Sequence, residues 1–156
     1  MNTLITQLQQ LYPKLGFEES NLFYYSASKN IIYHSILNHE EDDWALLHEV
    51  GHSISNHETY NSDYSLLKME VEAWEVAKTI AQKLKIKIDD NHIQDCLDSY
   101  RDWIYKRSLC PICKTSSFQD NLNNNYLCIN CNTRWKTNKS KLCRLYRKKI
   151  ESRTIN

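Results

Sequence analysis

Residues 48–52 have the types and the spacing of a metal site that supports hydrolysis. They read His48-Glu49-Val50-Gly51-His52. On a helix, positions i and i+4 lie one turn apart on the same face, so both imidazoles can reach one Zn²⁺ ion. Glu49 then lies beside the metal, where its carboxylate can take a proton from an activated water. The pentapeptide predicts a catalytic zinc held by His48 and His52, with Glu49 as the catalytic base.

The flanks of this pentapeptide predict the helix that the two histidines require. Apolar residues recur at helical spacing over about residues 42–55, and Asp42 and Asp43 come first as N-cap candidates. Gly51 lies inside this helix, where glycine costs about 1 kcal/mol relative to alanine. Such a glycine usually has a packing reason. We therefore expect another element to approach the backbone closely at Gly51.

A catalytic zinc usually has three protein ligands, so one ligand remains to be found. Glu70, Glu72 and Glu75 lie on a predicted helix at 64–84, whose apolar stripe comprises Met69, Ala73, Val76, Ala77, Ile80 and Leu84. At about 100° per residue, Glu75 points almost opposite this stripe, whereas Glu70 falls inside it and Glu72 on its flank. Periodicity therefore does not decide whether Glu70 or Glu72 is the third ligand.

His57 is a fourth candidate for the missing ligand. It follows His52 by five residues and lacks the glycine and the six-residue spacing of the extended three-histidine motif. We expect His57 to be a loop or helix-end residue. His34, His57, Tyr60 and Tyr64 are also candidates for donating a hydrogen bond to an oxyanion, and the sequence does not choose among them.

Four of the six cysteines predict a second metal site. They form two Cys-x-x-Cys pairs separated by 14 residues, namely Cys110, Cys113, Cys128 and Cys131. Paired knuckles at this spacing are typical of a structural zinc site rather than of a disulfide framework. We expect a closed four-thiolate zinc ribbon at about residues 108–135.

Charge is distributed very unevenly along the 156 residues, although the formal net charge is only +1. Residues 1–105 carry 8 Lys and Arg against 17 Asp and Glu, a net of −9, whereas residues 106–156 carry 12 against 2, a net of +10. Such a split predicts two units with different partners. No apolar run approaches the roughly 18 residues of a membrane span. No secretory signal is visible either, so a cytoplasmic protein is expected.

The remaining pattern predicts an α+β fold. Helices are expected at 3–12, 42–55, 64–84 and 91–107, with strands at 22–27 and 31–36 joined by a turn at 28–30. Short strands are expected in the ribbon near Tyr126-Leu127 and Arg134-Trp135, and a helix near the end of the basic tail. The predicted domains are a metal-binding domain at 1–107 and a ribbon with its basic tail at 108–156.

These motifs together resemble the ImmA/IrrE-like zinc metallopeptidases. The resemblance rests on the segment 46–52, Leu-Leu-His-Glu-Val-Gly-His, and on 70–74, Glu-Val-Glu-Ala-Trp. That family has an H-E-x-G-H helix and a downstream Glu-Ala-Asn-type motif, whose glutamate is the third zinc ligand. The resemblance covers about residues 22–85 and implies Glu72 as that ligand, with Trp74 in place of the usual Asn. It also implies a small zincin-like (gluzincin) fold with the strand at 31–36 bordering the cleft.

The resemblance implies a zinc-dependent endopeptidase of restricted specificity. His48, His52 and Glu72 would hold a catalytic zinc, and Glu49 would act as the base. In this family the substrate is commonly a DNA-bound repressor, so a transcriptional regulator is the expected protein substrate. A non-catalytic adaptor that keeps the peptidase fold only for binding is an alternative.

A second resemblance, to the SprT/Spartan-like proteases that act on DNA–protein crosslinks, rests on the order of metal helix and zinc ribbon. Those proteins take their third ligand from a later histidine in a Gly-His context. In this chain the later histidines are His57 and His92, and neither has that context.

The basic C-terminal region predicts a second kind of partner. Its cations are interleaved with Tyr126, Trp135 and Tyr146. Lys and Arg can neutralise phosphates while aromatic rings stack on bases, so nucleic acid is the expected partner. A protein partner, or docking onto the acidic part of the chain, is the alternative.

Overall fold

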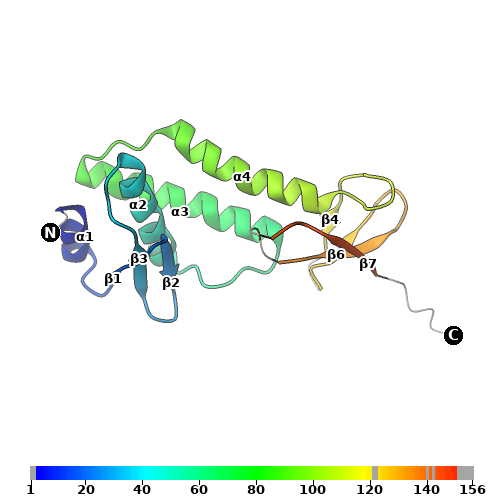
Figure 1. Ribbon diagram of the computed structural model, residues 1–156, viewed down its shortest axis with the longest axis horizontal. Helices are drawn as coiled ribbons and strands as arrows, with labels where there is room; N and C mark the ends of the chain where they lie inside the picture. Colours follow the sequence, from blue (N-terminus) through cyan, green and yellow to red (C-terminus); the bar gives the residue numbers. More distant parts are fainter. Residues whose placement is uncertain (1–2, 121–122, 140, 142, 151–156) are drawn as a thin grey trace. The chain divides into compact units, whose positions relative to one another are not determined.

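The computed structural model describes residues 3–120, 123–139, 141 and 143–150, and has the predicted α+β composition (Figure 1). The chain divides into two compact units. The first comprises residues 1–59 and 68–94, and the second comprises residues 60–67 and 95–156. Within the described residues, no helix combines the length and the apolar character that crossing a membrane requires.

The first unit begins with α1 (Thr3–Leu11) and a three-stranded sheet. β2 (Tyr24–Ser26) and β3 (Ile31–His34) form the predicted antiparallel hairpin, with Asn30 in the left-handed region at φ 53°. β1 (Gly16–Glu19) pairs in parallel with β3, giving the order β1-β3-β2. β1 was not predicted, because its four residues have no alternating pattern and its pairing with β3 is non-local.

The predicted metal helix is α2 (Glu40–Ile54), and it begins two residues before the expected start. The N-cap of α2 is His39 and not Asp42, which occupies the N3 position three residues after the cap. The Asp42 Oδ2 atom accepts hydrogen bonds from the backbone N–H groups of Asn38 and His39, both at 3.0 Å. These bonds lower the pKa of Asp42. Asp42 thus satisfies backbone donors ahead of the helix, which is the reciprocal half of a capping box.

α2 meets α3 (Asp63–Leu84) at Gly51. A Cβ atom built on Gly51 would lie 2.2 Å from the carbonyl oxygen of Ala73 and 2.9 Å from its carbonyl carbon. Real Cβ atoms do not approach backbone this closely, so only glycine permits the crossing. The packing reason predicted for Gly51 is confirmed, and the approaching element is the backbone of α3.

The first unit's part of α3 buries one helical stripe. Its members are Glu70, Ala73, Trp74, Ala77, Ile80 and Ala81. They recur at intervals of three and four residues, which is the period of one helix face. The α3 stripe packs with the buried face of α2 in the core of this unit, and it carries one carboxylate, that of Glu70, among apolar residues.

Gly51→Ala should destabilise the protein despite the better helix propensity of alanine. Propensity alone predicts a gain of about 1 kcal/mol, whereas overpacking against backbone predicts a loss of about 1–3 kcal/mol or more. Urea unfolding of the zinc-loaded protein measures the difference. Gly16→Ala is the comparison and should cost less, because its new Cβ would meet a side-chain atom, Ile31 Cγ1, at 2.9 Å and no backbone atom closer than 3.6 Å. Unchanged or increased stability in Gly51→Ala would contradict the close crossing.

The second unit contains most of α4 (Asp90–Ser108) and a four-stranded antiparallel sheet. Its strands are β4 (Phe118–Gln119), β5 (Tyr126–Leu127), β6 (Arg134–Thr137) and β7 (Arg147–Ile150), paired in that order. The predicted strands near Tyr126 and Arg134 are confirmed. The helix predicted near the end of the tail is wrong for residues 147–150, which extend the ribbon sheet; residues 151–156 lie outside the described part of the chain.

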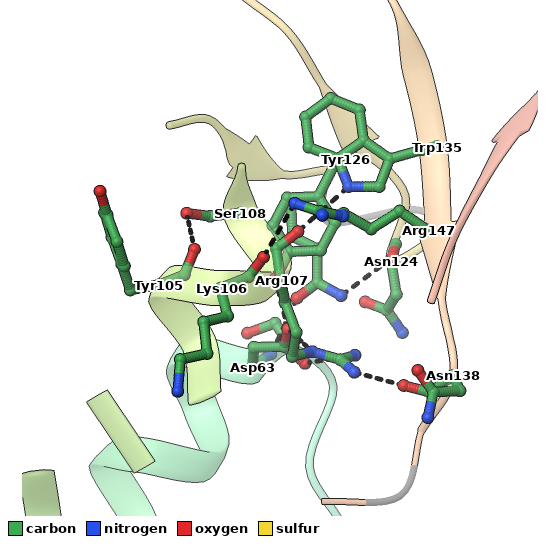
Figure 2. A network of polar contacts seen from close by, with 12 residues as sticks. Asp63, Tyr105, Lys106, Arg107, Ser108, Asn124, Tyr126, Trp135, Asn138 and Arg147 are labelled. Atoms are coloured by element: carbon green, nitrogen blue, oxygen red, sulfur yellow. Dashed lines mark hydrogen bonds and ion pairs between the residues drawn. The ribbon is translucent and has the colours of Figure 1, made fainter. Parts of the chain in front are cut away.

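A buried ion pair anchors this sheet to the helices of the second unit (Figure 2). Arg107 Nε donates to Asp63 Oδ2 at 2.6 Å, and its Nη2 donates to Asp63 Oδ1 at 3.2 Å. The Tyr126 hydroxyl donates to the same Asp63 carboxylate. Trp135 Nε1 donates to the Arg107 carbonyl oxygen at 3.1 Å. Strands β5 and β6 are therefore tied to the N-terminal end of α3 and the C-terminal end of α4.

Removing one partner of this pair should cost much more stability than removing an exposed one. Asp63→Ala leaves the Arg107 guanidinium, whose side chain is 4% exposed, without its counter-charge. We expect a loss of about 3–5 kcal/mol in urea unfolding. Asp98→Ala, which breaks the exposed pair with Arg101, should cost no more than about 1 kcal/mol. Equal effects of the two substitutions would contradict an anchoring role for Asp63.

Candidate metal centres

The first candidate centre brings His48 and His52 of α2 together with Glu70 of α3. The two Nε2 atoms are 3.0 Å apart. Glu70 places Oε2 at 3.1 Å from His48 Nε2 and Oε1 at 3.6 Å from His52 Nε2. All three ligand atoms lie within 4.8 Å of one another, a separation that one metal ion can span. Two imidazole nitrogens and one carboxylate form a donor set used by catalytic zinc.

The first centre carries a buried negative charge at neutral pH. Burial raises the pKa of Glu70, but hydrogen bonds with His48 and His52 more than offset this and bring it to about 2. Glu70 is therefore ionised at neutral pH. The side chain of Glu70 is only 8% exposed, so its negative charge is largely withheld from water. A divalent cation at this point would compensate that charge.

The side chain of Trp74 forms one wall of the centre. Its ring lies 4.4 Å from the His48 ring, centroid to centroid, at an interplanar angle of 32°. Trp74 in turn contacts the His92 ring edge-on, as does Trp44. Here the tryptophan restricts the His48 ring by packing, whereas the buried His48 Nδ1 has no hydrogen-bond partner among the described residues.

Glu72, which the resemblance implied as the third ligand, lies elsewhere. Its Oε2 atom is 3.3 Å from His57 Nε2, and its side chain is 55% exposed. Position 72 is two residues, or about 200°, away from Glu70 around the helix, so the two carboxylates leave opposite sides of α3. Of the two glutamates left open by periodicity, the structure therefore places Glu70 against the histidines, and the expectation for Glu72 is corrected.

His57 connects Glu72 to the rim of the centre. Its Nδ1 atom lies 2.9 Å from Nδ1 of His52, on the side of that ring opposite the Nε2 that faces Glu70. A chain Glu72–His57–His52 thus orients one of the two imidazoles. Partners of this kind fix the tautomer and the direction of a metal-binding histidine. Sequence reasoning did not assign this role to either residue, because contacts between a loop and a helix face leave no periodic signal.

Glu49 lies between the two histidines in sequence, directly after His48, and its carboxylate contacts strand β2. Its Oε2 accepts a hydrogen bond of 2.8 Å from the backbone N–H of Tyr25 in β2. Burial raises the pKa of Glu49, while the charges of His48 and His52 and the Tyr25 bond oppose that rise. The strand expected at the cleft was 31–36. The strand that reaches Glu49 is instead β2, because β3 is central and its backbone is paired on both sides.

The remaining histidines considered from the sequence have other contacts. His34 is buried in β3, and its Nδ1 pairs with the Ser35 carbonyl oxygen at 2.9 Å. His92 packs against two tryptophan rings and is not among the residues whose ligand atoms converge. The third ligand of a Spartan-like site is therefore not supplied by His92.

The second candidate centre consists of the four cysteines, as predicted. Their Sγ atoms lie 3.6 Å apart for Cys110 and Cys131, 3.4 Å for Cys113 and Cys128, and 3.5 Å for Cys113 and Cys131. A disulfide would need about 2.05 Å. Tetrahedral coordination at a Zn–S distance of about 2.3 Å separates sulfurs by roughly 3.8 Å. The cluster fits a four-thiolate zinc site.

The two halves of the cysteine cluster repeat each other. Residues 110–115 and 128–133 share the pattern Cys-x-x-Cys-x-Thr. In each half the carbonyl oxygen of the first cysteine accepts a hydrogen bond from the backbone N–H of the residue four positions on. That residue, Lys114 or Asn132, has a positive φ. The threonine hydroxyl contacts the second cysteine of its half, at 3.3 Å in Cys113 and 3.1 Å in Cys131.

These hydrogen bonds favour thiolate at Cys113. Bonds with the side chain and backbone of Thr115 lower the pKa of Cys113 to about 5. Thiolate is the form that binds zinc. The Cys-x-x-Cys-x-Thr repeat is visible in the sequence and could have identified Thr115 and Thr133 as supporting residues.

Comparisons with known proteins add no relatives. No protein-family model matches the chain, and no curated protein or solved structure is significantly similar to it. The two centres therefore rest on the chain's own residues.

Metal stoichiometry separates Glu70 from Glu72. The zinc-loaded wild type should contain two zinc ions per chain. Glu70→Ala should retain one, because the histidine centre loses its only carboxylate, whereas Glu72→Ala should retain two at high zinc. Elemental analysis after gel filtration measures both. One zinc in Glu72→Ala together with two in Glu70→Ala would contradict the assignment.

Proposed function

We propose that the protein is a zinc-dependent endopeptidase of restricted specificity. The observation that carries the proposal is the convergence of His48, His52 and Glu70 with Glu49 adjacent in the same helix. A structural zinc site has no need of a carboxylate next to its ligands in sequence, and it usually closes all four positions with protein atoms. Three converging ligands leave a position for water or substrate.

Each residue has a distinct task in this proposal. His48, His52 and Glu70 would hold the zinc, which supplies a Lewis acid that activates water and polarises a carbonyl. Glu49 would accept the proton of the attacking water and deliver it to the leaving amine. The Tyr25 N–H bond holds the Glu49 carboxylate in place, and burial raises its pKa toward that of an effective base. Trp74 and the Glu72–His57 pair would hold the two imidazoles in position.

The resemblance to ImmA/IrrE-like peptidases supports this proposal with one change. The ligand carboxylate would come two residues before the position implied by that resemblance, within the pattern Glu70-x-x-Ala73-Trp74. A protein substrate such as a DNA-associated transcriptional repressor is proposed on the resemblance alone. The Spartan-like alternative is supported by the order of metal helix and ribbon alone, because its candidate ligand His92 is packed against Trp44 and Trp74.

Glu49→Gln should abolish hydrolysis while retaining both metals. The amide has nearly the size of the carboxylate but cannot accept the proton, and loss of a general base typically costs about 10²–10⁴-fold in rate. The zinc-loaded protein is incubated with a peptide library whose N-termini are blocked, and mass spectrometry identifies the new N-termini. Wild type should generate them, a chelator should stop their appearance, and Glu49→Gln should generate almost none.

Glu75→Gln is the control for this experiment, because it changes an exposed carboxylate of the same helix that contacts neither the proposed ligands nor the residues that orient them. It should retain most of the activity. Full activity in Glu49→Gln would remove Glu49 from the mechanism. A wild type that carries both zinc ions and cleaves no peptide would favour the non-catalytic adaptor.

A further inference from the structure

The register of the ribbon sheet shows which side chains share its outer face. In an antiparallel sheet, directly paired residues point to the same side. Phe118 pairs with Leu127, Leu127 with Arg134, and Arg134 with Ile150, while Lys136 pairs with Lys148. We name the resulting set the outer ribbon face: Phe118, Leu127, Arg134, Lys136, Lys148 and Ile150.

The opposite face of the same sheet is the buried one. Gln119, Tyr126, Trp135 and Lys149 form the alternate row of the register. Tyr126 and Trp135 stack there at 5.3 Å and are 2% and 0% exposed. They contact the Asp63–Arg107 pair shown in Figure 2. The core of the unit therefore lies on that side, and the outer ribbon face points away from this core.

The cations of the outer ribbon face have no counter-charge. Arg134, Lys136 and Lys148 are exposed, and none takes part in an ion pair with the described residues. Lys136 and Lys148 lie directly opposite each other on neighbouring strands, where like charges repel. Arg147 is different, since its Nη1 donates to the Leu109 carbonyl oxygen at 3.0 Å. Neighbouring like charges that have no ion-pair partner in the part of the chain that the structure describes are suited to an external anion.

One aromatic side chain, that of Phe118, ends this face at its β4 edge. Phe118 is 81% exposed, an unusual position for a large apolar ring. Phe118 also borders a pocket of about 490 Å³ that lies round the β4 edge on the buried side of the sheet, where Asp63, Tyr126, Tyr64 and Tyr105 line it. Tyr64 and Tyr105 are themselves 74% and 57% exposed. Three accessible rings thus lie within one unit that also carries the unpaired cations.

We propose that the outer ribbon face binds single-stranded nucleic acid. The cations of β6 and β7 would contact phosphates and Phe118 would stack on a base, while Tyr64 and Tyr105 lie round the β4 edge, where the strand would leave the face. Charge complementarity supports a polyanion, since residues 106–156 carry a net charge of +10. The exposed rings favour a single strand over a duplex, because only unpaired bases offer their faces for stacking. An acidic protein would satisfy the cations but would give the rings no flat partner.

Fluorescence anisotropy with the full zinc-loaded chain tests this proposal. The probes are labelled oligothymidylate, oligouridylate and a duplex DNA of the same length, each titrated at several salt concentrations. Single strands should bind more tightly than the duplex, and the DNA and RNA arms decide which strand is preferred. Phe118→Ala should weaken single-strand binding about fivefold or more, the loss expected for one stacked base.

Charge neutralisation is tested with a matched pair of triple variants. Arg134→Gln with Lys136→Gln and Lys148→Gln should lower the slope of log affinity against log salt by about 2, since each phosphate contact contributes about 0.7. Lys14→Gln with Lys83→Gln and Lys87→Gln changes the net charge equally through exposed lysines of the first unit and should leave the slope unchanged. Zinc content and circular dichroism verify that each variant is folded.

Three results would overturn the proposal. The first is an absence of binding to both single strands at low salt. The second is equal weakening by the two triple variants, which would show that only net charge matters. The third is unchanged affinity in Phe118→Ala together with equal binding of duplex and single strands, which would reduce the face to a general polyanion site.

Discussion

The contact on which the histidine centre depends is the approach of the Gly51 backbone to the Ala73 carbonyl. It lets two helices cross at a distance that any side chain at position 51 would prevent. Gly51 precedes His52, and Ala73 follows Glu70 by three residues on the same stripe of α3. The crossing point therefore lies among the candidate ligands. A wider crossing would separate the carboxylate from the imidazoles, because Glu70 has only three side-chain torsions with which to follow them.

The two centres solve the problem of holding a metal in different ways. The histidine centre takes its donors from two helices, so the distances between the donor atoms depend on how those helices pack. Trp74 and the Glu72–His57 pair restrict the rings that this packing places together. The cysteine centre is local: in each knuckle a backbone N–H donates to the sulfur of the first cysteine, and a threonine hydroxyl contacts the sulfur of the second. On a four-coordinate zinc, the three ligands of the first arrangement would leave one position for water, whereas the four thiolates of the second would occupy every position.

In the second unit, burial of the Asp63–Arg107 pair decides which face of the ribbon is available. Tyr126 donates to the Asp63 carboxylate and Trp135 to the Arg107 carbonyl oxygen, so both point to this pair and the alternate row of side chains must point away. The period of two along a strand then places the unpaired cations and Phe118 on one side together. The interaction surface is thus a consequence of how the unit forms its core.

The sequence predicted the parts of this structure that local patterns determine. The helix of His48 and His52, the hairpin ending at β3, and the cysteine cluster follow from spacing and periodicity, and all are confirmed. The fold class is confirmed as well. Periodicity reduced the third ligand to Glu70 or Glu72, but the choice depends on how α3 is rotated against α2, which no local pattern encodes.

Non-local pairing explains the other differences. β1 forms a strand because it pairs with a free edge of β3. In the same way, β7 pairs with the free edge of β6 and extends the ribbon sheet. Neither segment has a strand pattern of its own: β1 is Gly-Phe-Glu-Glu, and β7 is Arg-Lys-Lys-Ile. The packing of Trp74 against the His48 ring depends likewise on how α3 meets α2, and no local pattern predicts it.

Anomalous diffraction at the zinc edge from crystals of the zinc-loaded protein tests the central claim most directly. The account predicts a peak about 2.0–2.2 Å from His48 Nε2, His52 Nε2 and one carboxylate oxygen of Glu70, with a second peak among the four cysteines. A first peak bound by Glu72 or His57 in place of Glu70, or no peak between the two histidines, would contradict it.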